Sequence, residues 1–127
     1  MGRIGQLGLV AAGGSVGALV RWIISEASPS SDFPWPTLVV NVVGCALLAL
    51  VTTGSSSIPQ RRFLGTGFAG GLTTFSTLSI EIVMLVDDGR LATALIYVAA
   101  SFLLGLVAFI GVRAMRGGAG ERIVEAT

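Results

Sequence analysis

The sequence predicts an all-α membrane protein of four transmembrane helices, the third of which is broken near its centre. Of the 127 residues, 53% are hydrophobic and only 12% are charged, whereas soluble domains carry about 25% charged residues. The apolar residues gather in four segments, and each is close to the roughly 20 residues that a helix needs to cross a bilayer. Lipid is therefore expected to surround most of the chain.

We place the four spans of this single domain at about residues 5–25, 35–53, 63–86 and 91–115. Proline and glycine in the short connectors between them indicate helix ends. The first span is not expected to be a cleaved signal peptide, because neither a cleavage site nor a polar mature domain follows it. Residues 117–127 are expected to form a disordered tail.

Composition excludes several classes of function. The chain has no histidine, and its single cysteine, Cys45, cannot form an intrachain disulfide or a thiolate cluster. The glycines at 13–17 do not follow a strand and are not expected to bind phosphate. No catalytic residues are predicted, so the chain is not expected to be an enzyme or to bind nucleic acid.

The arginines are distributed unequally between the two ends of the spans. With four spans, both termini share one side with the second connector. Six arginines lie on that side and two on the other: Arg3, Arg61, Arg62, Arg113, Arg116 and Arg122 against Arg21 and Arg90. Because basic residues favour the cytoplasmic side, both termini are predicted to be cytoplasmic.

Polar residues at membrane depth are costly and are candidates for function. Asn41 in the second span either forms an interhelical hydrogen bond or lines a pathway. The third span carries two adjacent glycines, Gly70 and Gly71, and then five hydroxyl residues within residues 73–79. This composition favours a broken helix, whose released carbonyls would suit a small cation. The alternative is a kinked helix whose hydroxyls bond to preceding carbonyls.

Further polar residues extend this set. Tyr97 and Ser101 share one face of the fourth span, as packing contacts or as the wall of a polar track. Glu81 lies near the end of the third span, and Phe75 lies among the hydroxyl residues. Neutral donors without a deep positive charge suit a small anion, which can also contact the positive edge of an aromatic ring.

The chain resembles the small bacterial fluoride channels called Fluc or CrcB. The resemblance rests on residues 13–21 (GGSVGALVR), on residues 37–44 (TLVVNVVG) and, most specifically, on residues 67–77 (GFAGGLTTFST). It covers nearly the whole chain. It implies a fluoride-specific channel in the bacterial cell membrane, built as an antiparallel dimer in which two subunits insert in opposite orientations.

The resemblance also implies roles for individual residues. A structural, non-transported sodium ion at the dimer centre would be held by the carbonyls of Gly70 and Thr73. The fluoride pathway would include Asn41, Phe75, Ser76, Thr77, Tyr97 and Ser101. Arg21 would lie near the vestibule, and Glu81 would flank the path.

One residue departs from the family's pattern. The usual second phenylalanine, three residues after the first, is Leu78 here, and leucine offers no positive ring edge. A protein that inserts equally both ways should also have balanced arginines. We therefore hypothesise pairing with a homologous subunit of opposite orientation, as an alternative to pairing with itself. In that case the chain could be a non-conducting or half-conducting supporting subunit.

The expected function is passive export of cytoplasmic fluoride, which lowers fluoride toxicity. The inside-negative membrane potential drives an anion outward by about 2.3 kcal/mol per 100 mV. A remote alternative is a small proton-coupled drug exporter, which needs a membrane-embedded carboxylate in its first span. Residues 5–24 contain no acid, which argues against that alternative.

Overall fold

Four helical segments of the chain are long and apolar enough to cross a membrane. The computed structural model describes residues 2–125, and side chains as far as Gly117. The spans are Arg3–Ala27, Trp35–Thr53, Ile58–Asp87 and Leu91–Gly117. Residues 2–125 contain no β-strand. The prediction of an all-α protein with four spans is confirmed.

The first, second and fourth spans are single helices, and the third consists of several pieces. Helices α1 (Arg3–Ala27) and α2 (Trp35–Thr53) come first, and α2 has the predicted limits. The third span comprises α3 (Ile58–Gln60), the π-helix η1 (Arg61–Ala69), α4 (Gly70–Leu72) and α5 (Phe75–Asp87). Helix α6 (Leu91–Glu125) forms the fourth span. π-Helical turns are rare and occur frequently at functional sites.

Two boundaries differ from the sequence prediction by more than two residues. The third span begins at Ile58 and not at residue 63, because Ser57 and Gln60 form a capping box that starts the helix early. Helix α6 continues through Glu125, where a disordered tail was predicted over 117–127. Residues 121–125 include glutamate, arginine and isoleucine, which helices accept. Residues 126 and 127 lie outside the described part of the chain.

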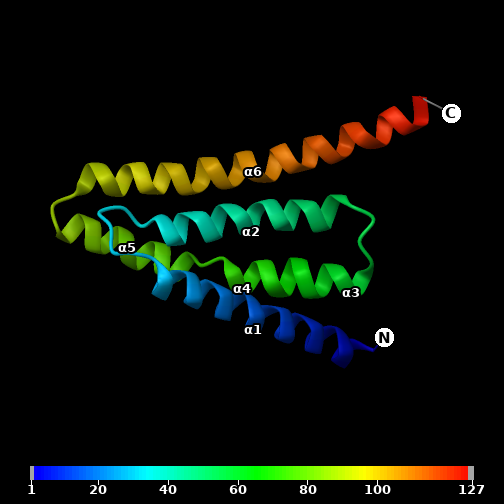
Figure 1. Cartoon of the computed structure of the whole chain (residues 1–127), viewed down its shortest axis with the longest axis horizontal. Helices are drawn as coiled ribbons and strands as arrows, with labels where there is room; N and C mark the ends of the chain where they lie inside the picture. The colour runs from blue at the N-terminus through cyan, green and yellow to red at the C-terminus, as the bar shows by residue number, and fades with distance from the viewer. Residues whose placement is uncertain (1, 126–127) are drawn as a thin grey trace.

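The helices lie side by side in an order that differs from the chain order. α2 packs between α6 and η1, and α1 packs on the other side of η1 and α4 (Figure 1). The start of α1 and the far end of α6 lie at the same end of the bundle (Figure 1). This placement agrees with an even number of spans.

Glycines let α1 approach the third span at backbone distance. A Cβ on Gly13, Gly17 or Gly71 would lie 2.2 Å from a backbone oxygen of the facing helix. Gly67 belongs to the same contact, since its Cβ would lie 2.8 Å from the Val10 oxygen. Two pairs of glycines spaced four residues apart therefore interlock, as small residues do between membrane helices.

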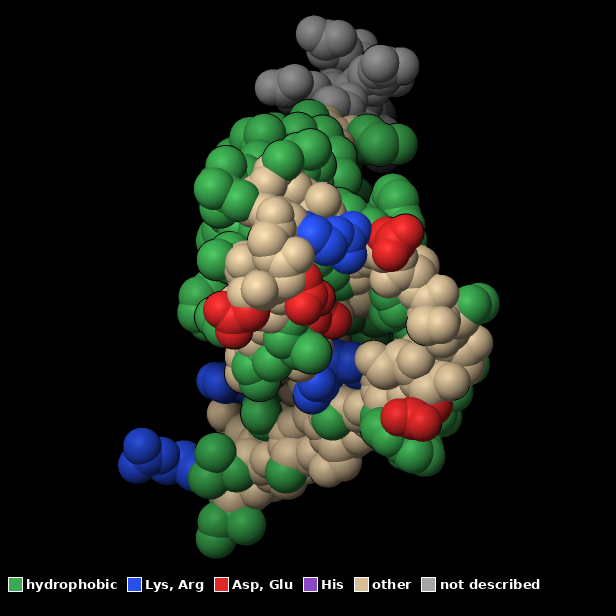
Figure 2. All heavy atoms as spheres, turned by 90° about the vertical axis from the view of Figure 1, so that its left-hand side faces the viewer, with side chains coloured by type: hydrophobic (Ala, Val, Ile, Leu, Met, Phe, Trp, Pro, Cys, Tyr) green, Lys and Arg blue, Asp and Glu red, His purple; other side chains and the backbone are tan. Residues whose placement is uncertain are grey.

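A small apolar core lies between α2, α5 and α6, and the outer surface is largely hydrophobic. The core cluster contains Leu38, Leu78, Leu85, Ala94 and Tyr97. Many large hydrophobic side chains are exposed on the single chain, whereas carboxylates and arginines gather at the end of the bundle that faces the viewer in Figure 2. Arg90 donates to the backbone oxygen of Asp32 there and joins the two connectors. The polar end and the apolar outer surface are those of a membrane-spanning bundle.

Candidate functional site

The break in the third span lies at Thr73 and Thr74. Both residues have extended backbone, with ψ angles of 153° and 126°. The glycine pair before them stays helical, and Gly70 has φ −65° and ψ −36°. The prediction of a break is therefore correct, and the break lies at the first two hydroxyl residues and not at the glycines. Gly71 serves a close helix contact rather than an unusual backbone conformation.

Asn41 on α2 holds the break in place. Its Oδ1 accepts from the Thr74 N–H at 2.8 Å, and its Nδ2 donates to the Thr74 carbonyl oxygen at 3.1 Å. The amide oxygen therefore takes the place of the helical acceptor that the Thr74 N–H lacks, and the amide nitrogen adds a second bond to the same residue. Nδ2 carries two hydrogens. Among the described residues, only the Thr74 carbonyl accepts a hydrogen bond from this atom. The interhelical hydrogen bond expected as one alternative is present, and one donor remains for another partner.

The hydroxyl residues of the third span bond mainly to one another and to backbone. Thr74 Oγ1 caps α5 by accepting from the Thr77 N–H at 3.2 Å. The same atom lies 3.0 Å from Thr77 Oγ1 and 3.2 Å from Ser76 Oγ. Thr73 Oγ1 donates back to the Ala69 oxygen at 3.0 Å, as in a kinked helix. The break in the helix thus occurs together with a hydrogen bond from a hydroxyl back to a preceding carbonyl. The hydroxyls of Ser76 and Thr77 support the start of α5.

The break leaves the carbonyls of Gly70 and Thr73, among those of residues 70–73, without their helical N–H partners. The Thr74 N–H donates to Asn41 instead of Gly70, and the Thr77 N–H donates to Thr74 Oγ1 instead of the Thr73 oxygen. Among the described residues, the Gly70 oxygen receives only a 3.5 Å contact from Thr73 Oγ1. Gly70 is also exposed on the single chain.

These two carbonyls have the chemistry that a hard monovalent cation requires. Uncharged backbone oxygens bind sodium where helices are interrupted. Within the described part of the chain, no three side chains of His, Cys, Asp or Glu gather in a way that could hold a metal ion. The residues present therefore fit a cation held by carbonyl oxygens, as expected for Gly70 and Thr73, and do not fit a side-chain metal centre.

Arg21 on α1 reaches the same break from the other side. Its Nε donates to the Gly71 carbonyl oxygen at 3.2 Å. That carbonyl lies at the C-terminal end of α4, where a positive charge is favourable. Arg21 is partly buried, so it lies against the broken span and not at the outer end of the bundle.

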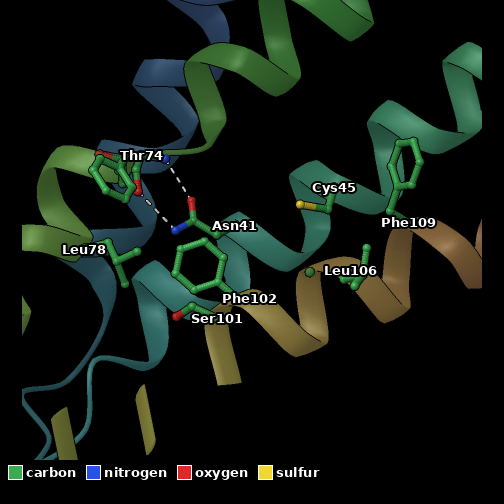
Figure 3. A pocket seen from close by; sticks show the side chains of 10 residues that line it. Asn41, Cys45, Thr74, Leu78, Ser101, Phe102, Leu106 and Phe109 are labelled. Carbon is green, nitrogen blue, oxygen red and sulfur yellow. Dashed lines mark hydrogen bonds between the residues drawn. The ribbon is translucent and has the colours of Figure 1, made fainter. Parts of the chain in front are cut away.

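An open groove of about 400 Å³ runs along the surface next to the break. Polar groups line one of its ends, where Asn41, Thr74 and Ser101 lie close together (Figure 3). The rest of its lining is apolar and includes three phenylalanines. The residues of this apolar part are Cys45, Phe75, Leu78, Phe102, Gly105, Leu106 and Phe109. The structure therefore brings the predicted residues Asn41, Phe75 and Ser101 together in one groove.

Tyr97 and Glu81 form a second polar group behind the groove. The Tyr97 hydroxyl donates to Glu81 Oε2 at 2.6 Å, and the Thr37 hydroxyl donates to Glu81 Oε1 at 2.9 Å. Tyr97 is completely buried and does not line the groove. Ser101 follows it by one turn and donates to the Tyr97 backbone oxygen at 2.7 Å.

Glu81 also lines a smaller cavity that faces one end of the bundle. This cavity has a volume of about 220 Å³ and polar and charged walls that include Asp32, Asp88 and Arg90. Glu81 is partly buried, so its carboxylate lies between the charged end and the buried Tyr97. The expectation that it flanks a path at the end of the third span is compatible with this position.

Leu78 is a core residue in this chain. Only 4% of it is exposed, and it belongs to the core cluster with Tyr97. It contributes to the groove wall next to Phe75. Phe75, by contrast, is 72% exposed. The two residues that the family pattern pairs therefore have different surroundings here.

Several residues of the site have no distinct signal in the sequence. Thr37 and Thr74 are two of many hydroxyl residues, and Phe102 and Phe109 are two of many apolar residues in the fourth span. A spacing of seven places Phe102 and Phe109 on one helix face. The sequence does not indicate which face of so apolar a helix meets α2.

Comparison with known proteins identifies the family. The family model described as "CrcB-like protein, Camphor Resistance (CrcB)" matches residues 8–112. A relative in Mycobacterium tuberculosis, named "Fluoride-specific ion channel FluC 1", is 43% identical over 110 residues and covers 81% of this chain and 83% of its own. "Fluoride-specific ion channel FluC" of Thermus thermophilus is 42% identical over 113 residues, with 83% and 90% covered.

A further relative, "Fluoride-specific ion channel FluC 1" of Halobacterium salinarum, is 45% identical over 82 residues, which are 65% of this chain and 69% of the relative. The matched residues include all three sequence motifs on which the resemblance rests. The resemblance is therefore confirmed. With its four spans, the chain is a multi-pass membrane protein that belongs to the CrcB-like family.

Proposed function

We propose that this chain is a subunit of a fluoride-specific ion channel that exports cytoplasmic fluoride passively. Relatives of similar length are named fluoride-specific ion channels. The observation that carries the proposal is the groove, which Asn41, Ser101 and the exposed ring of Phe75 line together. This combination of neutral donors and a ring edge suits a small anion.

The chemical difficulty for such a channel is the removal of water from a small, strongly hydrated anion. The free hydrogen of Asn41 Nδ2 would supply one replacement bond. The Ser101 hydroxyl now donates to the Tyr97 oxygen at 2.7 Å, and rotation would let it donate to the ion. Phe75 would present the positive edge of its ring. Among the described residues, none of those that line the groove carries a positive charge, so the ion would not be held too tightly to leave.

The pathway requires a second subunit. The groove is open on the single chain, and Phe75 is 72% exposed, although a conducting path must be enclosed. We propose that another subunit covers this face in the antiparallel arrangement that the resemblance implies. The partner is either a second copy of this chain or a homologous subunit of opposite orientation.

The released carbonyls of Gly70 and Thr73 would then face the centre of the dimer. There they would hold a structural sodium ion that is not transported. The exposure of Gly70 and the loss of its helical N–H partner support this assignment. Bound sodium would offset the partial negative charges of carbonyls brought together from two subunits.

Two observations favour a two-gene channel over a homodimer. More arginines lie on the side that carries both termini than on the other side. This excess predicts a single orientation in the cell membrane, with both termini in the cytoplasm. Leu78 also lacks a ring at the groove wall. In this second candidate function, the chain is a supporting subunit of a two-gene channel, and its own groove conducts little or nothing.

Fluoride efflux from liposomes that contain the purified chain tests the proposal. We expect efflux that requires a counter-ion pathway such as valinomycin with potassium, because passive movement of an anion separates charge. Chloride-loaded liposomes are the control and should retain their chloride. Absence of fluoride efflux, both from the chain alone and from the chain co-expressed with a homologous partner, would contradict the function.

A further inference from the structure

Phe102 on α6 lies at the polar end of the groove. It follows Ser101 directly, and its ring lies beside Asn41 and across from Leu78 in the close view (Figure 3). Its side chain is 61% exposed on the single chain. A large apolar ring is thus positioned next to the amide and hydroxyl donors.

The α5 side of the groove supplies fewer rings than the α6 side. Phe75 is the only aromatic residue of α5, since Leu78 occupies the next groove position and is 4% exposed. An anion beside Asn41 would meet the ring edge of Phe75 and an aliphatic side chain on α5. Phe102 faces the same space from α6 (Figure 3).

We propose that Phe102 is a pathway residue that supplies the second aromatic edge to fluoride beside Asn41 and Ser101. This inference rests on the proposed function. The ring hydrogens of phenylalanine carry partial positive charge, and the neighbouring donors are neutral, so the ring edge and the donors attract the same anion. The chain thereby provides on α6 an aromatic contact that Leu78 does not provide on α5.

Phe109 is a matched control on the same helix. It lines the same groove but lies two turns further along α6, near Cys45 and Leu106 and away from the polar groups (Figure 3). Seven residues of α-helix separate the two rings by about 10 Å along the axis. Phe109 therefore shares residue type, helix and groove with Phe102, but not the donors.

The first experiment compares Phe102→Met with Phe109→Met in fluoride efflux from liposomes. Methionine fills a similar apolar volume without a ring. We expect Phe102→Met to slow fluoride efflux about tenfold, which corresponds to about 1.4 kcal/mol in the barrier. Because Phe109 lines the groove away from the donors, Phe109→Met should slow efflux clearly less than Phe102→Met does. Both variants should assemble into the same oligomer on size-exclusion chromatography.

A second variant separates ring electrostatics from packing. Replacement of Phe102 by pentafluorophenylalanine keeps the ring and its position but makes the ring edge negative. If Phe102 contacts the ion through its edge, fluoride efflux should fall at least as far as in Phe102→Met. If the ring only fills space, efflux should stay near that of the unchanged protein.

The outcomes distinguish this inference from the proposed function. Rapid fluoride efflux in the unchanged protein and in both Phe102 variants would overturn the role of Phe102 and leave the channel function intact. Loss of the oligomer in Phe102→Met, together with normal efflux in the pentafluorophenylalanine variant, would assign Phe102 to packing and also overturn the inference. Absence of fluoride efflux in the unchanged protein, with or without a partner, would contradict both.

Discussion

At the scale of single residues, Asn41 combines two tasks that sequence reasoning treated as alternatives. Both polar atoms of its side chain bond to the backbone of Thr74, so it stabilises the break. It also lines the groove with a remaining donor hydrogen. A substitution at Asn41 therefore changes both the support of the third span and the lining of the groove.

Replacement of Asn41 by leucine should affect stability as well as transport. The change leaves the Thr74 N–H without its acceptor, and an unsatisfied buried polar group costs about 1–3 kcal/mol. We expect a lower unfolding temperature in detergent, together with strongly reduced fluoride efflux.

A control for this effect is Ser101→Ala, which removes a groove hydroxyl that bonds only within its own helix. Its unfolding temperature should stay close to that of the unchanged protein. An unchanged unfolding temperature in Asn41→Leu would show that the hydrogen bonds between Asn41 and Thr74 contribute little to stability.

At the scale of helices, the contact between α1 and the third span depends on missing side chains. Gly13 and Gly17 face Gly67 and Gly71 at backbone distance. No change of side-chain rotamer can make room for a Cβ against a backbone oxygen. The packing of these two elements is therefore more sensitive to small substitutions than the lipid-facing surfaces.

Gly13→Ala and Gly14→Ala form a matched pair that tests this contact. A Cβ on Gly13 would lie 2.2 Å from the Phe63 oxygen, whereas the nearest atom to a Cβ on Gly14 is 3.8 Å away. We expect Gly13→Ala to cost about 3 kcal/mol or more, as overpacking of a tight contact does, and to reduce the yield of monodisperse protein. Gly14→Ala should resemble the unchanged protein, and equal behaviour of the two variants would contradict the interlock.

The sequence predicts the spans well and the details of the break less well. The limits of α2 follow from Pro34 and Gly54, which flank it. The break was expected within the glycines and hydroxyl residues of 70–79, because both disfavour a continuous helix. In the structure, the glycines serve close packing and stay helical, and Asn41 supports the break at Thr74 from another helix. Such long-range support has no local signal in the sequence.

The residues of the groove could likewise be predicted only in part from the sequence. Asn41, Phe75 and Ser101 were predicted from their polarity or from the resemblance, and the structure brings them together. Phe102 and Phe109 could not be predicted, because α6 is apolar on all sides and its orientation depends on the packing against α2. Thr37 was missed because its partner, Glu81, lies 44 residues away.

At the scale of the whole molecule, one chain forms only one wall of the proposed pathway. The groove is open, Phe75 is exposed, and the Gly70 carbonyl lacks its helical partner on the outer surface. Gly70 and Phe75 flank the break at Thr73 and Thr74. We expect a covering subunit to enclose the groove together with these exposed groups.

The arginine distribution predicts a single orientation in the membrane. Cysteines placed at the N-terminus and in the 88–90 connector, in a Cys45→Ser background, can be labelled from outside the cell. We expect labelling only in the connector, and fluoride efflux that rises when a homologous partner is co-expressed. Fluoride-conducting dimers of this chain alone, with termini on both sides of the membrane, would contradict the two-gene hypothesis.

The central claim is that fluoride passes through the groove lined by Asn41, Phe75 and Ser101. Fluoride efflux from liposomes that contain Phe75→Met tests it most directly, because Phe75 is 72% exposed and its loss should leave the subunit folded. We expect efflux at least about tenfold slower, equal to a barrier about 1.4 kcal/mol higher, with the oligomer and unfolding temperature preserved. Efflux equal to that of the unchanged protein would contradict the account.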